Sequence, residues 1–190
     1  MKKLISLITF AFTMFAVQTS ALATSSHTVK KGETFWTIAK NYGVPVNHLM
    51  TANNTKHDQI WPGQTVKIPT NSISLEERKL LARLVEAEAK GEPYAGKVAV
   101  ATVVLNRVES DIFPNTIKGV VYDKHQFTPV SNGEINKPAS AESTRAVNEA
   151  VAFHGKGSGS LYFYNPKKTS NQWLRSKKVT VRIGEHIFAK

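Results

Sequence analysis

The feature that most constrains this fold is the stretch 74–94, SLEERKLLARLVEAEAKGEPY, which predicts one amphipathic helix with an abrupt end. Ser74, followed three residues later by Glu77, matches the capping box that begins many helices. Leucine and valine then recur at helical spacing and define one apolar face. Gly91 and Pro93 end the helix. The chain must therefore bury one side of this helix against a core.

Glu88 is the anomaly on that apolar face, because it lies four residues after Leu84 and seven after Leu81. The helix ends just past it, so burial and the negative end of the helix dipole should both raise its pKa. A carboxylic acid that stays protonated near neutral pH can serve as the general acid of a glycosidase. The alternative is a structural ion pair, for which Arg107 is a candidate. Glu86 lies on a different side of the helix from the apolar face, and we expect it to be solvated.

Length and charge limit the classes of protein. The 190 residues suffice for one medium domain or two small ones. The formal net charge of +11 favours an anionic partner such as a membrane, nucleic acid or an anionic cell wall. No basic run of the nucleic-acid-binding type is present, so we expect no nucleic acid partner. The absence of cysteine excludes disulfides and thiolate metal sites.

Residues 1–23 have the pattern of a signal peptide. Lys2 and Lys3 precede an apolar run over 4–17, and Ala21-Leu22-Ala23 offers a small-x-small cleavage site. The apolar run is short for a membrane span, so we expect export with no stable span after cleavage. An uncleaved anchor is the alternative. In either case the rest of the chain lies beyond the cytoplasmic membrane.

Residues 27–69 form a compact unit with the predicted order strand, helix, helix, strand. We expect the strands at 27–29 and 65–68 and the helices at 35–42 and 46–53. The unit resembles a LysM domain over its whole length, through the motifs TVKKGETFWTIAKNYGV, LMTANN and IWPGQTVKIP.

That resemblance implies binding of glycans that contain N-acetylglucosamine, such as peptidoglycan and chitin. The sugar groove should lie between two loops, one with Gly32, Glu33, Thr34 and Phe35 and the other with Ile60, Trp61 and Pro62. Backbone donors in such loops suit acetamide groups, and an apolar side chain can lie against a sugar face. In a unit this small, at least one of Phe35 and Trp36 should belong to the core.

A short polar linker over 70–73 leads to a second unit, 74–190. Its predicted elements after the first helix are helices at 94–108, 116–122 and 140–154, an irregular loop at 126–139, a strand at 161–165 and a terminal hairpin of 179–183 with 186–188. The valine-rich composition of segment 94–108 favours a strand, but its length favours a buried helix. The predicted class is therefore α+β, with a small βααβ domain before a mainly helical domain that ends in a β-hairpin.

The second unit resembles the catalytic domain of the SleB/CwlJ family of cell wall hydrolases. The resemblance rests on LARLVEAEAKGEPYAGKVAVATVVLNRV, FPNTIKGVVYDKHQFTPV, the YNP at 164–166 and RIGEHIF. It implies a fold similar to the lysozyme-like fold of lytic transglycosylases, and the family's catalytic glutamate matches Glu88. The implied chemistry uses this single glutamate first as acid and then as base, and it forms a 1,6-anhydro product.

Further residues of the second unit are expected to line the substrate cleft: Glu92, Gln126, Phe127, Tyr164 and Asn165. Amides and aromatic faces suit N-acetyl groups and sugar rings. Two alternatives stay open, because Glu92 could instead organise the turn that ends the helix, and Phe127 could belong to the core.

The histidines are scattered and form no close pair of the HExxH kind, so we expect no metal and no cofactor. A zinc site built from distant residues, such as His125, His154, Glu185 and His186, is the alternative. We expect an exported, monomeric enzyme, associated with the cell wall, that cleaves the bond between N-acetylmuramic acid and N-acetylglucosamine. The competing hypotheses are an N-acetylmuramoyl-L-alanine amidase, which ordinarily needs zinc, and a non-catalytic wall-binding protein.

Overall fold

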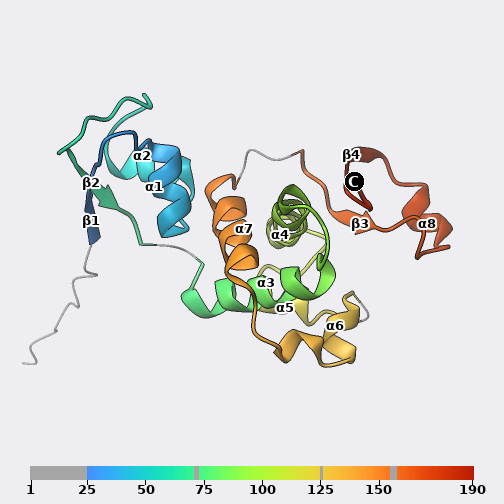
Figure 1. The fold of residues 1–190 in the computed structure, drawn as a ribbon. Coiled ribbons are helices and arrows are strands. Elements are labelled where there is room, and N and C mark those ends of the chain that lie inside the picture. The colour runs from blue at the N-terminus through green and yellow to red at the C-terminus, as the bar shows by residue number, and fades with distance from the viewer. Residues whose placement is uncertain (1–24, 71–72, 125, 155–157) are drawn as a thin grey trace, which may run out of the picture.

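The computed structural model describes residues 25–70, 73–124, 126–154 and 158–190. The signal peptide expected at 1–23 lies outside these residues. A small N-terminal unit with two strands and two helices lies beside a larger, mainly helical unit, and a small sheet occupies the far end (Figure 1). The predicted α+β class is confirmed.

The N-terminal unit has the predicted order of elements: β1 (Ser25–Thr28), α1 (Phe35–Tyr42), α2 (Val46–Ala52) and β2 (Thr65–Ile68). The two strands pair antiparallel, with Ser25 opposite Ile68. Helix α1 ends at Gly43, which has a φ of 61° in the left-handed region that favours glycine. Phe35 is buried in the core of this unit, as expected for one of the two aromatic residues.

The larger unit is built around three packed helices, α3 (Leu75–Glu88), α4 (Tyr94–Val108) and α7 (Ala141–Ala152). Helix α3 begins at the predicted capping box, since the Ser74 hydroxyl accepts from the Glu77 amide. Helix α4 has the predicted bounds, and its valines are buried on most sides, which explains why a β-favouring composition forms a helix. The short α5 (Ile117–Val121) closes the core below α3 and α4.

The predicted irregular loop at 126–139 was wrong in part, because it contains α6 (Thr128–Ser131) and a 3₁₀ turn at Glu134–Asn136. A proline in the first turn of α6 presets the backbone for a helix. The C-terminal hairpin is confirmed as β4 (Val179–Ile183) and β5 (His186–Ala189). Strand β3 (Tyr162–Tyr164) adds to β5, and a short helix α8 (Gln172–Arg175) that we did not predict precedes β4.

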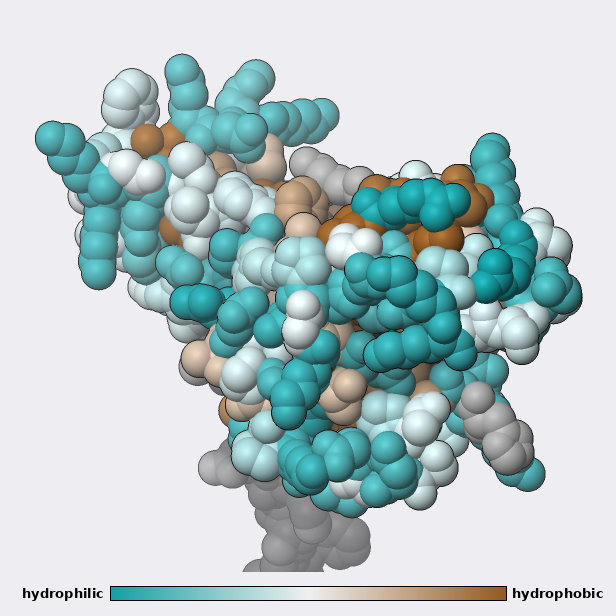
Figure 2. Space-filling model, turned by 45° about the vertical axis from the view of Figure 1, so that its right-hand side comes forward, coloured by the Kyte–Doolittle hydropathy of each residue, from teal (hydrophilic) through white to brown (hydrophobic). Residues whose placement is uncertain are grey.

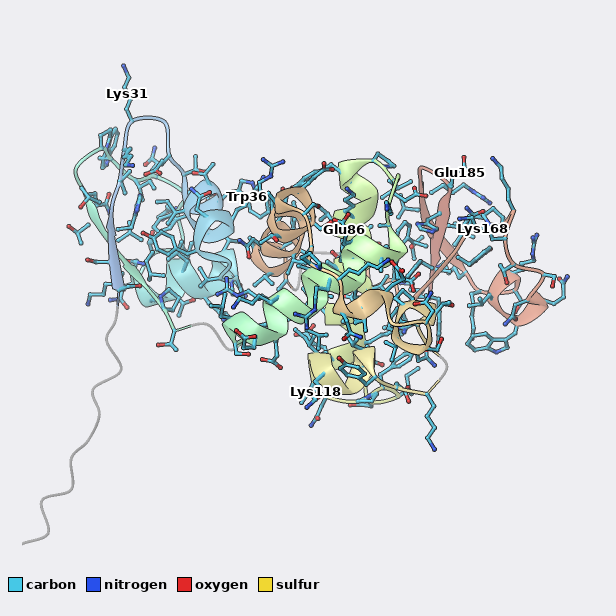
Figure 3. The ribbon with its side chains drawn as sticks, turned by 60° about the horizontal axis from the view of Figure 1, so that its bottom comes forward. Lys31, Trp36, Glu86, Lys118, Lys168 and Glu185 are labelled. Atoms are coloured by element: carbon cyan, nitrogen blue, oxygen red, sulfur yellow. The ribbon has the colours of Figure 1, made fainter. Side chains whose placement is uncertain are left out.

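The two units pack directly against each other, chiefly through α1 and α7. The rings of Trp36 and Phe153 lie 4.2 Å apart between their centroids, and Trp36 lies between the units in Figure 3. Lys40 Nζ lies 2.6 Å from Glu149 Oε2 across the same contact. Ala152, the last residue of α7, is fully buried within the core of the N-terminal unit. The short linker therefore joins two units that share a packed interface.

Hydrophilic side chains cover most of the face seen in Figure 2, in keeping with the many lysines and arginines. Within the described part of the chain, we find no helix with the length and apolar character needed to cross a membrane.

Candidate active site

Glu88 is the last residue of α3, and its side chain is partly buried. Burial raises the pKa of its carboxyl from 4.5 to about 7, while the positive charge of Arg107 opposes this shift more weakly. The predicted rise in the pKa is confirmed, with burial as its main cause. Near neutral pH a large fraction of this carboxyl is protonated and can donate a proton.

A groove of about 500 Å³ opens at Glu88. Its walls come from the end of α3, from the region of α6 and from the C-terminal sheet with the segment after β3. The residues that line it are Ala87, Glu88, Thr128, Pro129, Asn132, Glu134, Phe163, Tyr164, Asn165, Lys168, Thr169 and His186. The groove thus offers amide, hydroxyl and aromatic groups around the Glu88 carboxyl, which suits a polar sugar chain.

The structure brings three of the expected site residues together, because Tyr164 and Asn165 line the same groove as Glu88. Gln126 and Phe127 lie outside its lining. Gln126 Oε1 accepts a hydrogen bond of 3.1 Å from the guanidinium of Arg107, and Phe127 is buried in the core.

Arg107 is a buried cation surrounded by aromatic rings. Its Cζ lies 4.7 Å from the ring centroid of Phe113 and 5.3 Å from that of Phe127. Its Nε donates to the carbonyl oxygen of Leu161 at 2.8 Å. These partners hold the guanidinium in place, so the structural ion pair with Glu88 that we had considered is reduced to a weak attraction through space.

Glu92 lies outside the lining of the groove and holds the turn between β4 and β5. Its Oε2 accepts a hydrogen bond of 3.0 Å from the amide of Glu185, which is 93 residues away in the sequence. Its Oε1 lies 3.8 Å from Nδ1 of His186. The carboxylate of Glu92 therefore connects the turn after α3 to the hairpin. The structural role that the sequence suggested for Glu92 was limited to the turn that ends the helix.

His186 is a groove residue that sequence analysis did not assign to the cleft. It is buried, and burial lowers the pKa of its imidazole, so the ring is neutral at neutral pH. Its position within the RIGEHIF motif was the available signal. Lys168 and Glu134 also line the groove, and Lys137 Nζ lies 2.5 Å from Glu134 Oε1.

The expectation of a solvated Glu86 was wrong. Its Oε2 accepts hydrogen bonds from the hydroxyls of Ser140 and Ser143 at the start of α7, and these bonds lower its pKa to about 2. Figure 3 labels this residue, which lies between α3 and α7. The contact fixes α7 against the helix that carries Glu88.

The two expected sugar-binding loops of the N-terminal unit are exposed at Gly32, Thr34, Trp61 and Pro62. Glu33 and Ile60 are half-buried, and Ile60 packs against the core. Trp61 is 69% exposed, and Gly32 has a φ of 84° with open space around its Cα. Glu33 Oε2 accepts from the amide of Lys30 at 2.8 Å, and Thr34 caps α1. The turn is therefore preformed, with an indole free to contact a ligand.

No cluster of three or more histidine, aspartate or glutamate side chains suited to a metal ion occurs among the described residues, which exclude His125. The zinc site considered from the sequence would bring His154 and His186 together. In the structure, His154 lies 3.2 Å from Glu109, and His186 lies 3.8 Å from Glu92.

Comparison with protein families gives two matches. The family described as Cell Wall Hydrolase matches residues 91–189, and the LysM domain family matches residues 27–69. Glu88 lies just before the first match.

Curated relatives include the spore cortex-lytic enzyme of Bacillus cereus, which is 33% identical over 150 residues, 79% of this chain and 58% of its own length. The enzyme of the same name from Bacillus subtilis is 38% identical over 118 residues, 62% of this chain and 39% of its own length. The chain therefore spans less than two thirds of these relatives.

A solved structure, the catalytic domain of the germination-specific lytic transglycosylase SleB from Bacillus anthracis, is similar to this fold. The two are 37% identical with a TM-score of 0.60, and the match covers 65% of this chain and 100% of that domain.

Proposed function

This chain belongs to the cell wall hydrolase family and carries a LysM domain, and from that premise we propose that it cleaves the glycan strands of peptidoglycan as a lytic transglycosylase. The observation that carries this proposal is Glu88, a partly buried acid with a pKa of about 7 at the wall of a polar groove. The name of the similar solved domain supports the same chemistry.

In the proposed reaction, the protonated Glu88 donates its proton to the oxygen that links N-acetylmuramic acid to N-acetylglucosamine. The bond from C1 to that oxygen breaks. The carboxylate that remains then accepts the proton of the muramoyl 6-hydroxyl as its oxygen attacks C1. The products are a 1,6-anhydromuramic end and a free N-acetylglucosamine end, and Glu88 is protonated again.

A single acid is sufficient for this cycle, whereas ordinary glycoside hydrolysis uses two carboxyl groups that flank the bond. Glu134 is the other carboxylate in the described lining of the groove, and it is paired with Lys137. Tyr164 and Asn165 are proposed to contact the sugars, and Glu92 to hold His186 and the hairpin in position.

The LysM domain is proposed to bind the same polymer through its two exposed loops, with Trp61 against a sugar face. The expected signal peptide and the basic net charge agree with a protein that works at the cell wall or the spore cortex.

Mass spectrometry of digested peptidoglycan tests the reaction. We expect 1,6-anhydromuramic ends from the wild-type chain, and a loss of about a hundredfold or more in their rate of formation for Glu88→Gln. Glu76→Gln is the matched control, because it removes an exposed carboxylate from the first turn of the same helix.

Each alternative has its own product. New reducing ends, together with an equally inactive Glu134→Gln variant, would show hydrolysis by two carboxyl groups. Free stem peptides would show an amidase, and binding without any product would show a wall-binding protein.

A further inference from the structure

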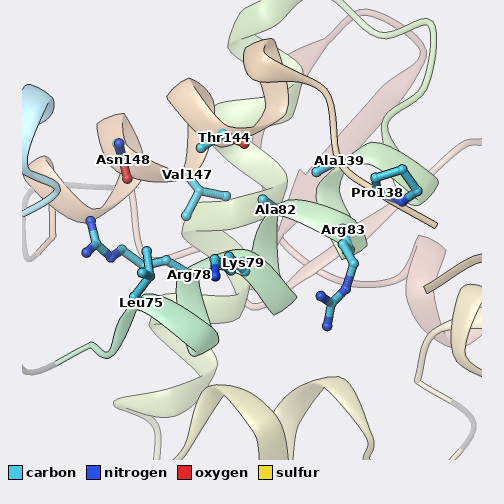
Figure 4. A pocket seen from close by; sticks show the side chains of 10 residues that line it. All are labelled: Leu75, Arg78, Lys79, Ala82, Arg83, Pro138, Ala139, Thr144, Val147 and Asn148. Carbon is cyan, nitrogen blue, oxygen red and sulfur yellow. The ribbon is translucent and has the colours of Figure 1, made fainter. Parts of the chain in front are cut away.

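Two further hollows continue from the groove along the outer side of α3. The middle hollow shares Ala87 and Glu134 with the groove of Glu88. It shares Arg83 and Pro138 with the outer hollow, which extends toward the LysM domain (Figure 4). The three spaces therefore adjoin one another in a row along α3, and we call this row the track.

Arg83 lies at the junction of the two hollows. Its Nε is buried and has no hydrogen-bond partner among the described residues. The Nε of Arg78, on the other side of the outer hollow in Figure 4, is in the same situation. Because both Nε atoms are buried from solvent, only the terminal nitrogens of these guanidinium groups can reach a ligand, and one of them, Arg78 Nη1, already donates to the carbonyl oxygen of Tyr42 at 3.3 Å.

The charge of the track is positive. Five cations line the two hollows: Arg78, Lys79, Arg83, Lys90 and Lys137. Lys79 pairs with Glu76 and Lys137 with Glu134, so the surplus positive charge comes from the other three. The two carboxylates there already have partners, since Glu86 accepts from Ser140 and Ser143 and Glu134 pairs with Lys137. An anionic ligand is therefore complementary to this surface.

The outer hollow also has an apolar floor, to which Ala82, Ala139 and Val147 contribute. A ligand that combines carboxylates with small methyl groups fits this combination. The peptide stems of peptidoglycan have that chemistry, because they contain alanine and free carboxylates and are attached to the muramic acid residues of the strand.

We propose that the track along α3 binds the peptide stem of a strand whose sugar lies in the groove, with Arg83 holding a stem carboxylate. This inference rests on the proposed function and narrows its substrate to strands that carry stems. Arginine suits the role because its planar fork pairs with a carboxylate through two parallel hydrogen bonds.

The test compares kcat/KM on glycan strands that carry stems with kcat/KM on the same strands after an amidase has removed them. We expect the wild-type chain to prefer stem-bearing strands. The ratio of the two values should fall about tenfold in Arg83→Met, the typical effect of losing one charged hydrogen bond. Arg182→Met, which removes an exposed arginine from β4, should keep the wild-type ratio.

Calorimetry gives a second readout that needs no catalysis. A free stem tripeptide should bind the Glu88→Gln chain, and its analogue with amidated carboxylates should not. Adding Arg83→Met should weaken binding of the acid form about tenfold, while circular dichroism checks that the variant is folded.

The outcomes separate the two proposals. If the wild-type chain cleaves both strands with a ratio that Arg83→Met leaves unchanged, the stem site is refuted and the enzyme assignment stands. If neither strand is cleaved but the tripeptide binds through Arg83, the enzyme assignment fails and the stem site stands. Equal binding of the acid and amidated peptides also refutes a carboxylate site.

Discussion

At the residue scale, the decisive quantity is the pKa of the Glu88 carboxyl, which burial raises to about 7. The proposed reaction begins with proton donation, so only the protonated form is active. We expect kcat/KM to be level on the acid side of this pKa and to fall tenfold per pH unit above about pH 7. A pH–rate profile measures this, and a fall centred at about pH 4.5, the pKa of a solvated glutamate, would contradict it.

The same pKa has a consequence for stability. A carboxyl whose pKa is higher in the folded state contributes stability below its unfolded value of 4.5, and that contribution is lost as the pH rises through about 7. The loss should be on the order of 3 kcal/mol for the wild-type chain. Urea unfolding at about pH 5 and about pH 8 measures it, and Glu88→Gln should lack this difference.

At the scale of the secondary-structure element, the β4–β5 hairpin positions His186 in the groove, and its turn packs closely on Glu92. Gly184 in this turn has a φ of 55°, and a Cβ added there would overlap Glu92 Oε2 and lie 2.7 Å from Pro93 Cδ. Gly184→Ala should therefore lower the free energy of unfolding by about 3 kcal/mol, the sum of backbone strain and overpacking. Denaturant unfolding measures the change.

Gly133→Ala is the matched control for the hairpin, because Gly133 has a φ of 82° but nothing within 4 Å of an added Cβ. It should cost only the backbone strain of about 1 kcal/mol. Equal losses in the two variants would show that the contact with Glu92 does not hold the turn.

At the scale of the whole molecule, the interface between α1 and α7 fixes the LysM domain relative to the active-site groove. Trp36→Ala removes the ring that contacts Phe153 and should lower the free energy of unfolding by about 2 kcal/mol, because a packed aromatic is lost. We also expect the single unfolding transition of the wild-type chain to broaden or separate into two. Calorimetry measures both effects.

Trp61→Ala is the control for the interface, since this tryptophan is 69% exposed on a loop. It should leave the free energy of unfolding within about 0.5 kcal/mol of the wild-type value. Its proposed role predicts weaker retention on insoluble peptidoglycan instead. If Trp36→Ala were as stable as Trp61→Ala, the interface would make no net contribution.

Contacts between residues far apart in the chain were beyond sequence analysis. Glu86 has its hydroxyl partners on α7, and Glu92 has its partner 93 residues away on the hairpin. No periodicity relates such positions, so we expected Glu86 to be solvated and placed Glu92 in the cleft. The short helix α6 was missed because the glycine and prolines of 126–139 indicate a loop, although a proline can also start a helix.

By itself, the sequence determined the local structure around Glu88: the start of α3 at its capping box, its apolar face and the end of the helix just past the acid. These features depend on neighbours within one or two turns, which the chain order specifies directly. Only the tertiary structure decided what surrounds that acid, namely the hairpin that presents His186 and the track that leads to Arg83. Those neighbours are set by how the helices and the sheet pack together, and packing depends on the shapes of all the buried side chains at once.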